Sequence, residues 1–85
     1  MSEDRTSLDA IYEQLTEILR EIFDDDTLVA TPDLNAEHVA GWDSFANIRL
    51  ILTIEKTFAV DFAAAQIAAL QNVGQLAALI HSKLR

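Results

Sequence analysis

The sequence predicts an all-α domain, a small four-helix bundle with a long first loop and a short third helix. Apolar residues recur at spacings of three and four in segments 8–23, 44–58 and 73–84, the period of helices with a buried face. No run alternates apolar and polar residues as a strand would, and no segment repeats another. At 85 residues, the chain is long enough for one domain with a single modest core.

The first predicted helix covers residues 8–23 and is clearly amphipathic. On a wheel of about 100° per residue, its large apolar side chains fall within roughly 140°; they are Leu8, Ile11, Tyr12, Leu15, Ile18, Leu19, Ile22 and Phe23. Four acids lie opposite at steps of four: Asp9, Glu13, Glu17 and Glu21. Ser7 or Thr6 can cap the helix, and the carboxylates of residues 24–26 should end it because they oppose its dipole.

Residues 24–43 form a long connection. Thr31-Pro32-Asp33 predicts a short helical turn, with Thr31 as cap and Pro32 at the first position. Four apolar residues are expected to hold the connection on the core: Leu28, Val29, Leu34 and Val39. We expect no metal site at Asp24-Asp25-Asp26, because three consecutive carboxylates do not easily face one ion.

The second predicted helix, residues 44–58, has an apolar arc wider than one buried face requires. The arc covers roughly 220° of the wheel. Its middle is expected to be core: Ile48, Leu50, Ile51, Ile54 and Phe58. Phe45 and Leu52 lie at its rim beside Arg49 and Lys56. Exposed apolar groups flanked by charges suit a docking surface, and the alternative is that the loop covers them.

The rest of the chain predicts a short third helix over residues 62–70 and a last helix after Asn72. Ile67 and Leu70 should turn inward in the third helix, and Asn72 should cap the last one. The apolar face of the last helix is formed by Val73, Leu76, Ala77, Ile80 and Leu84. Residues 1–6 are expected to be flexible, so that one domain spans residues 7–85.

Charge and composition exclude several classes of function. The net charge is -8, with -10 on residues 1–43 and +2 on residues 44–85, so no basic stripe exists to bind nucleic acid. The absence of cysteine excludes disulfides, thiolate metal sites and cysteine nucleophiles. No apolar run approaches about 18 residues and the N-terminus lacks a secretory pattern. We therefore expect a cytoplasmic monomer without a membrane partner.

The segment Gly41-Trp42-Asp43-Ser44-Phe45 leads directly into the second helix. With Asp43 as N-cap, the Ser44 hydroxyl would stand at an exposed helix start, where free N–H groups and the helix dipole tolerate an attached phosphodiester. An ordinary helix cap is the competing interpretation. Trp42 is expected to anchor the loop on the bundle rather than to contact a partner, although both are open.

Catalysis by Ser44 itself is disfavoured. A nucleophile elbow needs Gly-x-Ser-x-Gly, and Ala46 stands where the second glycine should be. His38 and His81 are distant in sequence, and neither pairs with an obvious orienting acid. A chain of this length also leaves little room for a substrate pocket.

This motif resembles the Asp-Ser-Leu signature of acyl carrier proteins, in which the serine carries 4'-phosphopantetheine, with Phe45 in place of Leu. Length, acidity and helix order extend the resemblance over residues 7–84. It implies that a phosphopantetheinyl transferase, engaged by Asp43, attaches the arm from coenzyme A to Ser44. The arm's thiol then holds an acyl or aminoacyl group as a thioester. Such a chain is a carrier and not an enzyme.

The resemblance also implies partners: a loading ligase or acyltransferase, and downstream transferases or synthases. The residues expected to contact partners are Trp42, Phe45, Arg49, Leu52 and Lys56. Carriers of fatty-acid synthesis usually have acids along the second helix, whereas here Arg49 and Lys56 intrude and residues 63–71 contain no acid. We therefore expect a discrete carrier of a specialised biosynthetic pathway, with acyl, polyketide or aminoacyl cargo.

A second interpretation belongs to another functional class. The chain would be a non-covalent helical adaptor that binds a partner through Phe45 and Leu52. A Ser44→Ala substitution distinguishes the two interpretations, because it should abolish the function of a carrier and leave the binding of an adaptor almost unchanged.

Overall fold

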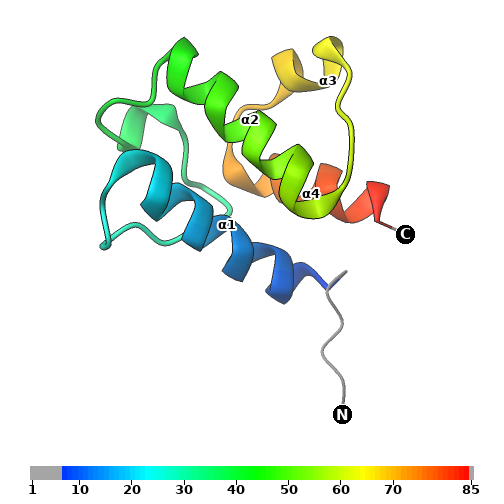
Figure 1. Cartoon of the computed structure of the whole chain (residues 1–85), viewed down its shortest axis with the longest axis horizontal. Helices are drawn as coiled ribbons and strands as arrows, with labels where there is room; N and C mark the ends of the chain where they lie inside the picture. Colours follow the sequence, from blue (N-terminus) through cyan, green and yellow to red (C-terminus); the bar gives the residue numbers. More distant parts are fainter. Residues whose placement is uncertain (1–6, 85) are drawn as a thin grey trace.

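The protein folds into a small helical bundle with a long first connection (Figure 1). The structure, a computed structural model, describes residues 7–84, and the flexible segment predicted at residues 1–6 lies outside them. Its helices are α1 (Leu8–Phe23), α2 (Ser44–Phe58), α3 (Ala64–Ala69) and α4 (Val73–Lys83), with a 3-10 turn, η1 (Ala36–His38), in the first connection. The all-α prediction is confirmed, and α1 and α2 have the predicted bounds.

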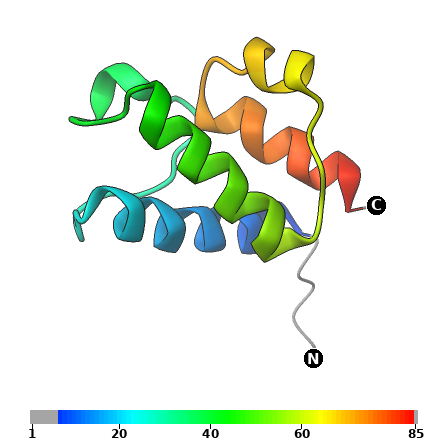
Figure 2. The same cartoon turned by 45° about the horizontal axis from the view of Figure 1, so that its top comes forward.

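Helix α1 packs against both α2 and α4, and α3 lies on the side of the bundle away from α1 (Figures 1 and 2). The core lies where α1, α2 and α4 meet. Its most completely buried large side chains are Ile11, Leu15, Leu19, Leu50, Ile54, Val73 and Ile80. These residues come from the predicted apolar faces of three helices, so burial of those faces is what holds the bundle together.

Two hydrogen bonds tie the first connection to α1. The Ala30 N–H donates to Thr16 Oγ1 at 2.9 Å, and Arg20 Nε donates to the Leu28 carbonyl at 2.7 Å. Both donors and acceptors are partly buried, where an unmade hydrogen bond is costly. The connection is therefore held in place although it has little regular structure.

Two further hydrogen bonds tie the connection to the start of α4. The Val73 N–H donates to the Leu34 carbonyl at 2.8 Å, and the Gly74 N–H donates to the Pro32 carbonyl at 2.9 Å. A Cβ atom on Gly74 would lie 2.9 Å from that same oxygen. Glycine at this helical position thus permits a close approach of backbone that any other side chain would push apart.

The predicted helical turn at Thr31-Pro32-Asp33 is wrong. The Leu34 N–H closes a simple turn onto the Thr31 carbonyl at 3.1 Å, while the Thr31 hydroxyl donates to Asp33 Oδ1 at 2.8 Å. The helical turn is instead η1, whose cap Asn35 accepts from the Glu37 N–H at 2.8 Å. Thr31 does not act as a cap because its side chain is engaged with Asp33.

Three residues that were expected on buried faces are exposed. Leu8, in the first turn of α1, is 43% exposed. Val29 is 52% exposed, whereas Leu28 and Leu34 pack against the core as predicted. Val39 is buried but does not belong to the core cluster. Ile48 is 56% exposed and is not part of the core. The buried residues of α2 are Leu50, Ile51 and Ile54, and Ile48 lies outside this group.

Helix α3 begins two residues later than predicted. Phe62 is buried and lies before the helix, in the link between α2 and α3. The Phe62 N–H donates to Glu55 Oε2 at 2.9 Å. Its ring is also capped by Lys83, whose Nζ lies 5.7 Å from the ring centroid. Ile67 and Leu70 pack against the core as predicted, and Asn72 caps α4 by accepting from the Gln75 N–H at 2.8 Å.

Candidate functional site

The start of α2 is fixed by the side chain that precedes it. Asp43 has an extended backbone, its Oδ1 accepts from the Ala46 N–H at 2.9 Å, and its carbonyl accepts from the Asn47 N–H at 2.9 Å. Gly41, at a φ of 86°, provides the left-handed turn that brings the chain into this position. The predicted N-cap is confirmed, and it sets where the next residue, Ser44, stands.

Ser44 is exposed in the first turn of α2. Among residues 7–84, the N–H groups of Ser44 and Phe45 have no acceptor, as expected for the first positions of a helix. These two donors and the positive end of the helix dipole favour a negatively charged group bonded to the Ser44 hydroxyl. The site thus fits the attachment of a phosphodiester.

Trp42 connects the motif to the bundle. Its half-buried ring packs against Phe23 at the end of α1, with ring centroids 5.4 Å apart and tilted by 39°. Its Nε1 donates to Asn47 Oδ1 at 3.0 Å. Trp42 therefore has the geometry of the predicted anchor, and a contact with a partner stays a prediction. Asn47 carried no signal in the sequence, because a pairing five residues apart follows no helical spacing rule.

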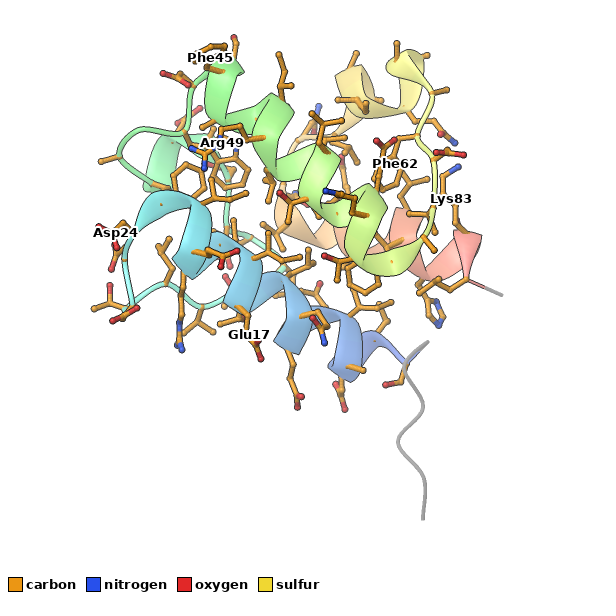
Figure 3. The ribbon with its side chains drawn as sticks, in the orientation of Figure 1. Glu17, Asp24, Phe45, Arg49, Phe62 and Lys83 are labelled. Atoms are coloured by element: carbon orange, nitrogen blue, oxygen red, sulfur yellow. The ribbon has the colours of Figure 1, made fainter. Side chains whose placement is uncertain are left out.

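The outward face of α2 carries five exposed residues that we call the α2 outer stripe: Phe45, Ile48, Arg49, Leu52 and Lys56. They share an arc of about 100° on the helical wheel. Phe45 is 80% exposed and Leu52 is 56% exposed, so the first connection does not cover them. Figure 3 shows Phe45 at the start of α2, pointing away from the bundle. The expected exposure of Phe45 and Leu52 is thus observed.

A small pocket of about 100 Å³ lies between α2, α3 and the first connection. Its lining includes Asn47, Leu50, Ile51, Ile67 and Leu76. Ligand sites for ordinary small molecules occupy about 300 Å³ or more. The pocket is therefore too small for the substrate site of a typical enzyme.

Two of the remaining candidate residues, His38 and Asp25, have hydrogen-bond partners. His38 Nδ1 accepts from the Asn35 N–H at 3.3 Å, so this nitrogen is engaged in the η1 cap. The hydroxyl and N–H of Thr27 both donate to Asp25, which holds the pKa of that carboxyl below its usual value. Within residues 7–84, no three His, Cys, Asp or Glu side chains are grouped as metal ligands, and no helix is long and apolar enough to span a membrane.

The chain is similar to known proteins in two comparisons. A family model described as a phosphopantetheine attachment site matches residues 13–80. Among solved structures, the chain is similar to a holo acyl carrier protein from Geobacter metallireducens, determined in solution by NMR. The two are 38% identical, the match covers 87% of this chain and 85% of that chain, and the TM-score is 0.83. A search of curated protein sequences finds no match.

Proposed function

Because this chain belongs to the acyl carrier protein family, whose members bear a phosphopantetheine attachment site, we propose that Ser44 is the residue that carries its 4'-phosphopantetheine. One observation carries the assignment. Ser44 is the only serine in residues 13–80, the range that matches the family model. It is also exposed at the start of α2, where a transferase can reach its hydroxyl.

The other serines of the described chain have structural positions. Ser7 caps α1 by accepting from the Ala10 N–H at 3.2 Å. Ser82 lies near the end of α4, and its hydroxyl donates to the Leu79 carbonyl at 2.8 Å. Both lie outside the range matched by the family model. Ser82 is exposed, so it provides a matched control for Ser44.

The function that follows is transport of an acyl or aminoacyl group as a thioester. The chain itself contains no cysteine, so the thiol is supplied by the phosphopantetheine group. Bond formation and cleavage then belong to partner enzymes, namely a loading ligase or acyltransferase and downstream transferases or synthases.

Asp43 is proposed to contact the phosphopantetheinyl transferase. Its Oδ1 accepts from the Ala46 N–H, which fixes the orientation of the carboxylate. Asp43 is also exposed, so its second oxygen is available to a partner. Asp43 thus has two roles in this proposal, as helix cap and as recognition element.

A specialised biosynthetic pathway is proposed in preference to housekeeping fatty-acid synthesis. The support is the charge of the α2 outer stripe, whose two charged residues, Arg49 and Lys56, are both basic. Residues 63–71, which include α3, contain no acid at all. Enzymes that recognise an acidic α2 would not find one on this chain.

Intact-protein mass spectrometry tests the assignment. The chain is incubated with coenzyme A, Mg²⁺ and a broad-specificity phosphopantetheinyl transferase, beside the variants Ser44→Ala and Ser82→Ala. The parent and Ser82→Ala should each gain one phosphopantetheinyl group, and Ser44→Ala should gain none. A folded parent chain that gains nothing from several transferases would overturn the proposal, and a non-covalent adaptor acting through Phe45 and Leu52 would take its place.

A further inference from the structure

Residues 40–45, which we call the Ser44 segment, pack on the bundle through Trp42 alone. Trp42 is half-buried, whereas the other residues of the segment, Ser44 included, are exposed. The backbone N–H of Trp42 donates to the nearby Val39 carbonyl at 3.3 Å, so this hydrogen bond stays within the first connection. The placement of the Ser44 segment against α1 therefore depends on the Trp42 ring.

The Trp42 ring has two contacts, at the end of the bundle where α1 ends and α2 begins (Figures 1 and 2). One contact is the tilted packing on Phe23, with ring centroids 5.4 Å apart. The other is the partly buried hydrogen bond from Trp42 Nε1 to Asn47 Oδ1 at 3.0 Å. Aromatic packing tolerates several ring orientations, whereas the single N–H of an indole must face its acceptor. The Trp42–Asn47 hydrogen bond therefore fixes the orientation of the ring.

Asn47 also closes the Ser44 segment from the side of α2. Its own N–H donates to the Asp43 carbonyl at 2.9 Å, while its side chain accepts from Trp42. Ser44 lies between the residues that each of these bonds joins, so both bonds restrict where its hydroxyl stands. Asparagine is a poorer helix former than leucine or alanine, so helix formation does not account for this residue in α2.

We propose that Asn47 is a positioning residue for the transfer of phosphopantetheine to Ser44. By fixing the Trp42 indole, Asn47 holds the Ser44 hydroxyl in the orientation that reacts with coenzyme A. In this transfer, the Ser44 oxygen forms a bond to the phosphorus next to the pantetheine, the pyrophosphate bond of coenzyme A breaks, and the nucleotide bisphosphate leaves. The hydroxyl proton goes to a base of the transferase.

The inference rests on the proposed function, because it concerns the reaction that loads Ser44. A nucleophile must stand close to the atom that it attacks and in line with the bond that breaks. A displacement of about 1 Å can therefore lower a rate by about 100-fold, even when the substituted residue does not touch the reacting atoms.

The indole N–H of Trp42 tests the contact itself. Trp42 is the only tryptophan of the chain, so this N–H gives a single proton NMR signal. Asn47→Leu removes the acceptor but keeps the number of side-chain atoms beside the small pocket that Asn47 lines. Exchange of the indole proton with water should become about twofold to tenfold faster, as expected for the loss of one ordinary hydrogen bond. Asn47→Asp keeps the acceptor oxygen and should keep the exchange slow.

Transferase kinetics test the role in the reaction. For Asn47→Leu, kcat should fall by about threefold to 100-fold while KM stays within about twofold, because the exposed surface around Ser44 is unchanged. Asn47→Asp should retain most of the parental kcat. Thr53→Val is the matched control, since it removes a side-chain hydrogen bond to the Arg49 carbonyl in the same helix and leaves Trp42 untouched. Its kcat should equal that of the parent.

A second substitution shows whether Asn47 acts through Trp42. Trp42→Phe removes the indole N–H and keeps an aromatic ring against Phe23. On its own it should lower kcat as Asn47→Leu does, so it carries the same test if Asn47→Leu does not fold. In the Trp42→Phe background, Asn47→Leu should cost little further, because the hydrogen bond is already absent. A direct contact of Asn47 with the transferase would instead give the same fold loss in both backgrounds.

Four outcomes would overturn the inference: unchanged indole exchange in Asn47→Leu, a parental kcat in that variant, a loss confined to KM, or the full loss in the Trp42→Phe background. The parent chain separates this failure from that of the proposed function. A parent modified at Ser44 beside unaffected variants refutes the inference alone. A parent that is never modified refutes the proposed function, and the inference with it.

Discussion

Helices α1 and α2 are almost equal in length, yet they use their apolar residues differently. In α1, the apolar side chains form one narrow arc that turns to the core, except for Leu8 in the first turn, and acids occupy the opposite face. In α2, the apolar arc is wider than the buried face, so Phe45, Ile48 and Leu52 remain exposed. These three exposed side chains do not contribute to the buried core that holds the bundle together. An apolar residue that the fold does not need is therefore a better indicator of a contact surface than an apolar residue as such.

The largest expected change in the free energy of unfolding is the difference between substitutions on the buried and the exposed side of α2. Ile54 is 0% exposed, so Ile54→Ala should lower the free energy of unfolding by about 2–5 kcal/mol, as should Leu15→Ala in α1. Leu52→Ala removes a similar side chain from the exposed side and should change the free energy of unfolding by less than about 0.5 kcal/mol. Urea unfolding measures all three variants. A loss above about 1.5 kcal/mol for Leu52→Ala would mean that another surface, such as a second copy of the chain, covers the stripe.

The N-caps give a smaller effect and a test of function. Ser7→Ala and Asp43→Ala each remove a side-chain cap and should cost about 1 kcal/mol. Asp43→Asn keeps the capping oxygen and should cost only a few tenths. If the Asp43 carboxylate also contacts the transferase, both Asp43 variants should be modified more slowly at Ser44, although only one is less stable. Parental modification rates in Asp43→Asn would show that Asp43 is a cap alone.

Sequence reasoning works best in this molecule where one regular period decides the outcome. The bounds of α1 and α2 follow from apolar spacing and capping residues, and so does the position of Ser44. The exposure of Ile48 does not follow, because the apolar arc of α2 is wider than its buried face and the wheel does not show which edge of the arc is left uncovered. The contacts of Gly74 with Pro32 and of Trp42 with Asn47 and Phe23 do not follow either. They depend on the path of the first connection, whose sequence has no regular apolar spacing from which its path could be predicted.

The smallest effect concerns the ends of the two helices. Both end in a left-handed residue that is not glycine, Asp24 at a φ of 50° and Ala59 at a φ of 58°. In each case, the next N–H also returns to the helix, onto the Arg20 carbonyl from Asp25 and onto the Glu55 carbonyl from Val60. The shared geometry is one that glycine adopts without steric cost.

The residue that glycine replaces, Asp24 or Ala59, determines why the replacement stabilises the chain. Ala59→Gly should stabilise the chain by about 0.5–1 kcal/mol, because relief of the left-handed strain exceeds the added entropy of the unfolded chain. Aspartate tolerates this conformation better, so Asp24→Gly should gain mainly by removing a charge that opposes the helix dipole, about 0.3–1 kcal/mol at low salt. Thermal unfolding at low and high salt distinguishes the two causes: only the Asp24→Gly gain should shrink as salt rises. Equal salt dependence in both variants would contradict this account, because the charge at the end of α1 would then not explain the difference between the two helices.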